Sequence, residues 1–300
     1  MTLHLEIRNE RLAEIINPTE ELEQLETGFD FVEGPIWNPI EASLIFSDIL
    51  GNSIYRWTEK EGTTTLRRNS YMANGNAYDK RGRVITCEHA TSRVTRTDFA
   101  KAAPLEILAS HYNERQLNSP NDVVVASSGL IYFTDPAAGR SETYGVPREP
   151  ELDISGVYRL DPQSGEIVLL IDDFEKPNGL CFSRDEKQLF INDSNRLHIR
   201  VFDLDGEGSL NNGAVWSEIM SEGTGVPDGM KIDQEDNIYC CGPGGIHLIG
   251  ADGASLGVIK MPEQTANLCF GDDDMQSLYM TASTSIYRLH VNIPGHNTFQ

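Results

Sequence analysis

The chain of 300 residues is long enough to bury a substantial core, and its 39% hydrophobic and 23% charged residues are typical of a soluble globular protein. Its formal net charge of −22 argues against nucleic acid and anionic lipid as partners, because their phosphates would be repelled. The longest apolar runs fall far short of the roughly 20 residues that span a bilayer. The N-terminus lacks the basic start and apolar stretch of a secretory signal, so we expect a cytoplasmic protein with no membrane partner.

A motif of one oxygen-bearing side chain followed by a short apolar strand recurs six times along the chain. A second strand begins nine to eleven residues after each of these side chains. A repeat of roughly 40 to 50 residues is typical of the blades of a β-propeller. The six side chains are Glu33, Asn74, Asn121, Asn178, Asp228 and Asn267, and the second strands begin at Leu44, Arg83, Leu130, Gln188, Asn237 and Ser277.

Each repeat continues with a turn rich in Asp, Gly or Asn, a second strand and, in most cases, a third strand. We therefore predict an all-β fold, a six-bladed β-propeller with four-stranded antiparallel blades around a central axis. The last repeat has too little chain for a fourth strand. We expect residues 1–28 to form an N-terminal extension that donates a closing strand around Leu22–Glu26, and residues 29–300 to form the propeller domain.

The third repeat carries an insertion, residues 136–155, that is rich in Gly, Pro and charged residues. Structureless loops of this length are often functional lids, although a tolerated surface insertion explains the same pattern. Arg140 and Tyr144 are the residues of the insertion that could cover a site, but nothing in the sequence fixes their direction.

The six recurring side chains are expected to converge, because the innermost strands of a propeller surround one axis. Four of them, Glu33, Asn121, Asn178 and Asp228, would bring two carboxylates and two amide oxygens together. Two carboxylates in one place repel each other and lose water, and a divalent cation resolves both costs. Oxygen ligands favour a hard ion of the Ca²⁺ or Mg²⁺ class, with Mn²⁺ as an alternative; Zn²⁺ usually recruits His or Cys.

Several other polar residues have both a functional and a structural interpretation. His89 ends the second strand of its blade, where it could hydrogen-bond a substrate or serve only the fold. Asn74 and Asn267 complete the ring, and we interpret them as contacts to substrate hydroxyls or axial waters. The five cysteines form no CxxC pair, so buried reduced thiols are expected. No HExxH, GxSxG or phosphate-binding Gly loop is present.

The segments EGPIW, SPNDVVV, KPNGLCFS and VPDGMKID resemble motifs of the SMP-30/gluconolactonase/regucalcin family of six-bladed propellers. RVITCEHATSRVTR and PGGIHLI resemble its bacterial gluconolactonase branch. The resemblance implies that Glu33, Asn178 and Asp228 hold a divalent metal, most readily Ca²⁺, and that Asn121 lies at the metal or contacts substrate through it. Where regucalcin-like members carry Arg, this chain has Ser119, and Asn118 is a candidate for part of that role.

The resemblance further implies a metal-dependent lactonase that hydrolyses a sugar lactone, gluconolactone first, to the aldonic acid. The metal would polarise the lactone carbonyl while an activated water attacks. Family precedent makes Asp228 the base or nucleophile, and a metal-bound water oriented by Asp228 is an equal alternative. Two other functions stay open, namely hydrolysis of other lactones or organophosphate esters, and a non-enzymatic calcium-binding propeller. A monomer and a homodimer are both compatible with the sequence.

Overall fold

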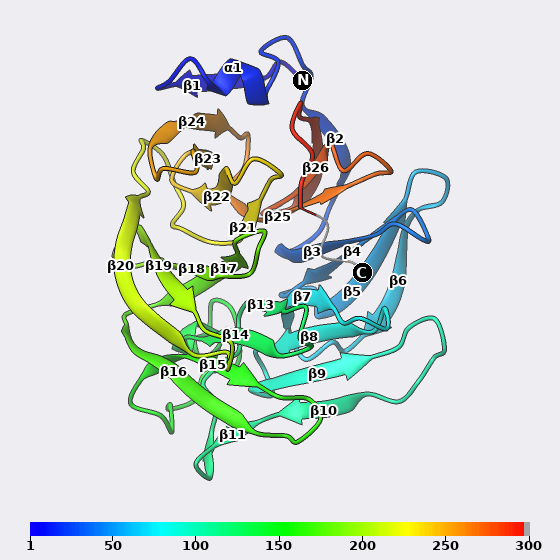
Figure 1. Cartoon of the computed structure of the whole chain (residues 1–300). Helices are drawn as coiled ribbons and strands as arrows, with labels where there is room; N and C mark the ends of the chain where they lie inside the picture. Colours follow the sequence, from blue (N-terminus) through cyan, green and yellow to red (C-terminus); the bar gives the residue numbers. More distant parts are fainter. Residues whose placement is uncertain (297–300) are drawn as a thin grey trace.

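The computed structural model describes residues 1–296 and is almost entirely β-sheet. Six antiparallel sheets follow one another around a central axis (Figure 1), so the predicted six-bladed β-propeller is confirmed. The first strand of each repeat contacts the first strands of the two neighbouring repeats, which makes these six strands the innermost ring. Within residues 1–296 no helix has the length and apolar character needed to cross a bilayer.

The strands of each blade run outward from the axis in chain order. Blades 1 and 2 contain β3 (Val32–Asn38), β4 (Ser43–Asp48), β5 (Ser53–Thr58), β6 (Gly62–Arg68), and β7 (Ala73–Tyr78), β8 (Val84–Glu88), β9 (Arg93–Thr97), β10 (Glu106–Ala109). Blades 3 and 4 contain β13 (Val123–Val125), β14 (Ile131–Asp135), β15 (Ser155–Leu160), β16 (Ile167–Phe174), and β17 (Pro177–Phe182), β18 (Gln188–Asp193), β19 (His198–Leu204), β20 (Leu210–Glu218). Blades 5 and 6 contain β21 (Met230–Ile232), β22 (Ile238–Gly242), β23 (Gly245–Ile249), β24 (Ser255–Lys260), and β25 (Thr265–Gly271), β26 (Ser277–Ala282), β27 (Ser285–His290). A two-stranded hairpin, β11 (His111–Tyr112) with β12 (Arg115–Gln116), leads from blade 2 to blade 3.

The second strand of each blade is almost completely buried, because neighbouring blades cover both of its faces. Every residue of β4 and of β26 is buried. Between these two blades the Trp37 and Tyr279 rings stack with their centroids 5.0 Å apart. The hydrophobic core is therefore divided into clusters between blades, and the five free cysteines are all buried, as expected.

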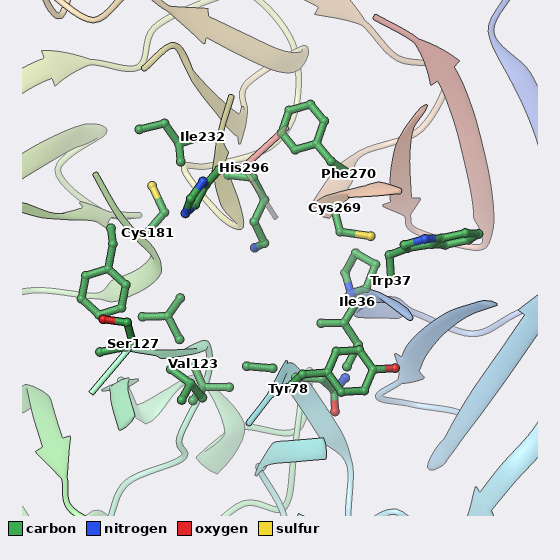
Figure 2. Close-up of a pocket in the computed structure, with 18 of the residues that line it drawn as sticks. Ile36, Trp37, Tyr78, Val123, Ser127, Cys181, Ile232, Cys269, Phe270 and His296 are labelled. Atoms are coloured by element: carbon green, nitrogen blue, oxygen red, sulfur yellow. The ribbon is translucent and has the colours of Figure 1, made fainter. Parts of the chain in front are cut away.

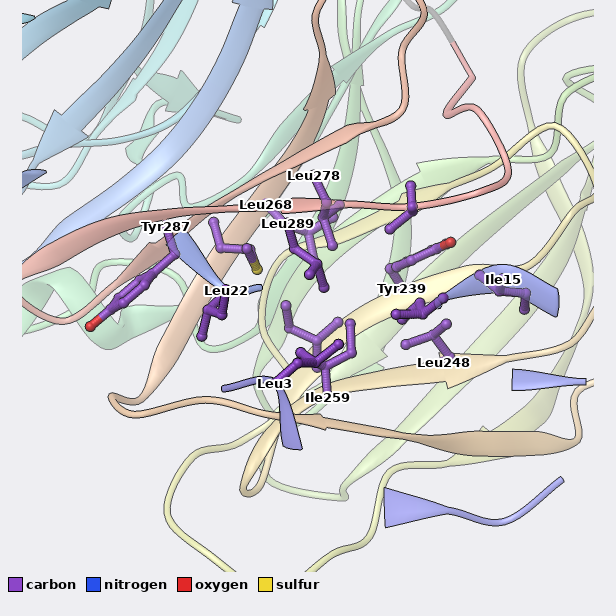
Figure 3. Close-up of a cluster of buried hydrophobic side chains, with 14 of the residues drawn as sticks. Leu3, Ile15, Leu22, Tyr239, Leu248, Ile259, Leu268, Leu278, Tyr287 and Leu289 are labelled. Carbon is purple, nitrogen blue, oxygen red and sulfur yellow. The ribbon is translucent and has the colours of Figure 1, made fainter. Parts of the chain in front are cut away.

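The N-terminal segment pairs with the last two blades. Strand β2 (Glu23–Thr27) lies antiparallel to β27 and gives blade 6 its fourth strand, joining the two ends of the chain. Strand β1 (His4–Ile7) pairs with β24 and adds a fifth strand to the outer edge of the four-stranded blade 5. The extra strand forms because the short helix α1 (Leu12–Ile15) and its flanks carry apolar side chains onto blades 5 and 6 (Figure 3). These buried residues are Leu3, Leu12, Ile15, Ile16 and Leu22.

The insertion after β14 is tied to blade 2 by buried polar contacts. It contains one 3₁₀ turn, η1 (Ala137–Arg140). The Arg140 guanidinium donates hydrogen bonds to the carbonyl oxygens of Leu117, at 2.7 Å, and Asn118, at 2.8 Å. Arg148 donates to the carbonyl oxygen of His89 at 2.7 Å. Gly139 lies against the His89 ring so closely that any larger residue would overlap it. The insertion is thus an ordered cover over one edge of blade 2.

Shortening a buried side chain of the N-terminal segment should destabilise the whole propeller. We expect Leu12→Ala to lower the free energy of unfolding by about 2–5 kcal/mol, since its side chain is fully buried between blades. Deleting residues 1–28 should lower the melting temperature further, because it removes both β1 and β2. Ile7→Ala is the matched control, as Ile7 is 57% exposed and should cost under about 0.5 kcal/mol. A deletion variant that melts like the full chain would contradict this account.

Candidate active site

The six recurring polar residues all lie at the beginning of an inner strand. Glu33, Asn74, Asn178 and Asn267 lie within β3, β7, β17 and β25, while Asn121 and Asp228 each precede an inner strand by two residues. Because all six strands lie around one axis with the same polarity, their first residues meet at one end of it. Asp228 is half-buried and the other five are buried.

Glycines after four of these residues allow neighbouring blades to approach closely. A side chain at Gly34 would overlap the Asn74 backbone, and one at Gly75 would overlap the Asn121 backbone. Gly179 and Gly229 are in the same position against Asp228 and Asn267. The recurring Asn-Gly and Asp-Gly pairs, which usually mark turns, are here required by the contact between adjacent inner strands.

Hydrogen bonds complete the ring where no glycine intervenes. The Asn267 Nδ2 amide donates to Glu33 Oε2 at 2.9 Å and links blade 6 to blade 1. The Thr134 hydroxyl donates to the Asn178 carbonyl oxygen at 2.8 Å and links blade 3 to blade 4. All six sequence-predicted ring residues are therefore brought to the same end of the axis.

The two ring carboxylates are held in an unfavourable environment. Burial, together with the nearby charge of Asp122, raises the pKa of Glu33 above its usual range. Burial and the charge of Glu33 likewise raise the pKa of Asp228. Two interacting, desolvated carboxyl groups of this kind favour either a shared proton or a bound cation.

Two buried amide oxygens of the ring have no hydrogen-bond partner among the described residues. They are Oδ1 of Asn121 and Oδ1 of Asn178. The Asn178 Nδ2 group donates to the Ser194 hydroxyl at 3.1 Å, which fixes the direction of the amide. An unpartnered buried oxygen costs about 1–3 kcal/mol, and a hard cation would satisfy both of these oxygens. The residues present therefore fit a divalent cation.

The donor set mixes carboxylates with amides. Within residues 1–296 no three His, Cys, Asp or Glu side chains gather as a metal cluster. A cation here would accordingly be held by Glu33 and Asp228 together with the oxygens of Asn121 and Asn178. A hard ion fits this oxygen-only set better than Zn²⁺ does.

The residues expected to contact substrate already have protein partners. Asn74 Nδ2 lies 3.0 Å from His89 Nε2, and His89 Nδ1 lies 2.8 Å from the Tyr144 carbonyl oxygen. Since the carbonyl can only accept, the proton of His89 resides on Nδ1 and Nε2 accepts from Asn74. His89 thereby joins the ring to the insertion.

Asn118 and Asn267 each support a neighbouring group. Asn118 Nδ2 donates to the Ile154 carbonyl oxygen at 2.7 Å, which anchors the end of the insertion, while its buried Oδ1 has no partner among the described residues. Asn267 orients Glu33. Their contacts to substrate remain predictions.

Sequence reasoning did not select three charged residues that the structure places near the ring. Asp122 is buried beside the ring, and its Oδ2 has no partner in the described part of the chain. The signal was a carboxylate in the position where four other repeats carry glycine. Lys176 and Lys231 flank the ring, and their positive charges act on Asp228 and Glu33 respectively. A lysine near a turn is too common for sequence reasoning to select it.

The side chains of Arg140 and Tyr144, the two residues of the insertion considered as cover for the site, point in different directions. Arg140 is turned into the protein, where it holds the loop before blade 3. Tyr144 faces the site, since its ring centroid lies 5.3 Å from that of Phe31, and burial and the charge of Asp228 raise its pKa. The insertion therefore places one aromatic side chain over the ring.

A cavity of about 110 Å³ occupies the opposite end of the axis (Figure 2). It is lined where the inner strands end, by residues that include Ile36, Trp37, Tyr78, Phe182 and Phe270. Its walls are predominantly apolar and offer few ligands for a hard cation. We therefore take the ring end of the axis as the candidate active site.

The buried state of His89 predicts a pH dependence of stability. Burial lowers the pKa of His89 from 6.5 to about 4, so its neutral form is favoured in the folded protein. This contribution is fully present above pH 6.5 and is lost as the pH falls towards 4, by an amount on the order of 3 kcal/mol. Denaturant titrations between pH 7 and 4 should show a smaller loss for His89→Gln than for the unmodified chain. Equal slopes would place the origin of acid sensitivity elsewhere.

Comparison with known proteins identifies the family of this chain. Residues 31–284 match the family model described as the SMP-30/Gluconolactonase/LRE-like region. The chain is 30% identical to a gluconolactonase of Zymomonas mobilis, with 95% of this chain and 85% of the relative covered. It is 26% identical to the regucalcin of Danio rerio, with 84% and 82% covered. A solved gluconolactonase from Xanthomonas campestris superposes with a TM-score of 0.88 at 31% identity, covering 96% of this chain and 94% of that one. The chain therefore belongs to the SMP-30/gluconolactonase/LRE-like family.

Proposed function

We propose that this chain is a metal-dependent lactonase that hydrolyses a sugar lactone, gluconolactone above all, to the aldonic acid. The lactonase class follows from its family and from the gluconolactonases to which it is similar along most of its length. The observation that carries the metal is the pairing of two desolvated carboxylates with two unpartnered amide oxygens at one end of the axis. Ca²⁺ suits these oxygen donors best, and Mg²⁺ or Mn²⁺ would be held by the same atoms.

The ring residues have different proposed roles in the reaction. Glu33, Asn121, Asn178 and Asp228 would hold the cation, which when bound supplies a Lewis acid for the lactone carbonyl. Asp228 accepts a proton from the attacking water, or orients that water; burial and the charge of Glu33 raise its pKa, and a raised pKa makes a carboxylate a stronger base. The water oxygen bonds to the carbonyl carbon, the ring C–O bond breaks, and the leaving oxygen takes the proton.

The surroundings position the substrate. The ammonium of Lys176 is a positive charge near Asp228, and a positive charge there would stabilise an oxyanion. Tyr144 supplies an apolar face, which suits the C–H face of a sugar ring. Asn74, Asn118, His89 and Asn267 are proposed contacts to the sugar hydroxyls, and in each case the same group also supports the protein.

Removing the charge of Asp228 should abolish turnover. We expect Asp228→Asn to lower kcat/KM for gluconolactone by about 10³-fold or more, measured by acid release, because both the proton acceptor and a cation ligand are changed. Asp236→Asn is the matched control, since Asp236 belongs to the same blade but lies on an exposed turn. Near-normal turnover of the Asp228 variant would remove this residue from the mechanism.

Chelation should remove both activity and part of the stability. We expect exhaustive dialysis against a chelator to eliminate lactone hydrolysis and to lower the melting temperature, because repulsion between Glu33 and Asp228 is then unscreened. Ca²⁺, Mg²⁺, Mn²⁺ and Zn²⁺ would then be added back singly. Full activity in the chelated protein would exclude the metal-dependent mechanism.

A substrate panel separates the alternative functions. Aldonolactones should be hydrolysed in preference to aryl esters and fluorophosphates by the same preparation, because the ring is surrounded by hydrogen-bonding amides suited to hydroxyl groups. The opposite preference would favour the organophosphate hydrolase. Absence of turnover with every substrate and metal would favour a calcium-binding propeller without catalysis.

A further inference from the structure

Lys231 lies on the axis between the candidate cation site and the cavity at the far end. It belongs to the inner strand β21, three residues after Asp228, and its side chain also lines the far cavity. Its ammonium donates hydrogen bonds to the Met230 carbonyl oxygen at 3.0 Å and to Asn267 Oδ1 at 3.4 Å. Within residues 1–296 its side-chain hydrogen-bond partner is Asn267, the amide that holds Glu33.

Lys231 and Lys176 are the positive charges that act on the carboxylates near the axis. Three carboxylates lie at the ring end of the axis, those of Glu33, Asp122 and Asp228. A divalent cation held by Glu33 and Asp228 balances two of them. The third, Asp122, accepts a hydrogen bond from the Val123 backbone N–H at 2.9 Å, but its buried Oδ2 has no partner among the described residues.

We propose that Lys231 is a specificity-determining residue of the cation site, which sets the ionic charge that the site accepts. Its ammonium is hydrogen-bonded to Asn267, which holds Glu33, so its fixed positive charge repels a trivalent cation more strongly than a divalent one. Lys231 touches neither substrate nor cation and acts through space and through Asn267. This inference rests on the proposed cation site.

An electrostatic role and a merely structural role of Lys231 predict opposite changes in cation affinity when the ammonium is removed. Repulsion between Lys231 and a bound cation is proportional to the charge of the cation. Removing the ammonium therefore strengthens the binding of every cation, and of a trivalent ion more than of a divalent one. If Lys231 served only to hold Asn267 and Glu33 in place, its removal would weaken the binding of both ions.

The test is cation affinity in the chelated full-length protein, measured by calorimetry with Ca²⁺ and with Tb³⁺. We expect Lys231→Met to lower the Kd for Ca²⁺ on the order of tenfold and the Kd for Tb³⁺ on the order of thirtyfold, as the ratio of the charges requires. Asp122→Asn should shift both Kd values in the opposite direction. The double variant should return close to the unmodified protein.

Lys80→Met is the matched control, since Lys80 lines the same far cavity but is exposed, and its charge is screened by water. It should leave both affinities unchanged. Unchanged or weakened binding in Lys231→Met would overturn the inference, and if that variant does not fold, Lys231→Gln, which also removes the charge, is measured in its place. Absence of Ca²⁺ binding in the unmodified chain would instead refute the cation site and the proposed mechanism themselves.

Discussion

The architecture depends on how closely six inner strands approach one another at one end of the axis. Where Gly34, Gly75, Gly179 and Gly229 follow a ring residue, the backbone of the next blade occupies the space that a side chain would need. This approach brings amide and carboxylate oxygens together from distant parts of the sequence. It also confines them in a desolvated place, where burial and neighbouring carboxylates raise the pKa values of Glu33 and Asp228 and two amide oxygens lack partners among the described residues. The same geometry thus favours either a shared proton or a bound cation at this end of the axis.

The ring remains in place because the propeller is closed. Asn267 and Glu33, which join the last blade to the first, are 234 positions apart in the chain, and their 2.9 Å hydrogen bond requires blades 6 and 1 to be adjacent. Strand β2 pairs with β27 and joins the two ends of the chain, and the apolar residues around α1 cover blades 5 and 6. The N-terminal segment therefore supports the candidate site without contributing a residue to it.

The insertion after β14 is joined to the ring by hydrogen bonds through His89. A chain of hydrogen bonds runs from Asn74 through His89 to the Tyr144 backbone, and Arg140 and Arg148 hold the remainder of the loop. Since His89 is buried and neutral, its position is determined by these two partners. A structural role for His89 and a functional role for the insertion are therefore compatible.

The repeat, the six ring positions and the family resemblance were readable from the sequence alone, because propeller blades repeat their strand pattern at a nearly constant spacing. Residues whose importance depends on contacts between blades could not be found in this way. Lys176 and Lys231 carry no pattern of their own, and the direction of Arg140 and Tyr144 depends on how the insertion folds back. The fifth strand of blade 5 was likewise missed, since a segment of four residues, His4–Ile7, is recognisable as a strand only beside its partner β24. The sequence determined which residues recur and in what order, whereas tertiary structure decided which of them lie within reach of one another, because burial and electrostatic interaction depend on distance in space.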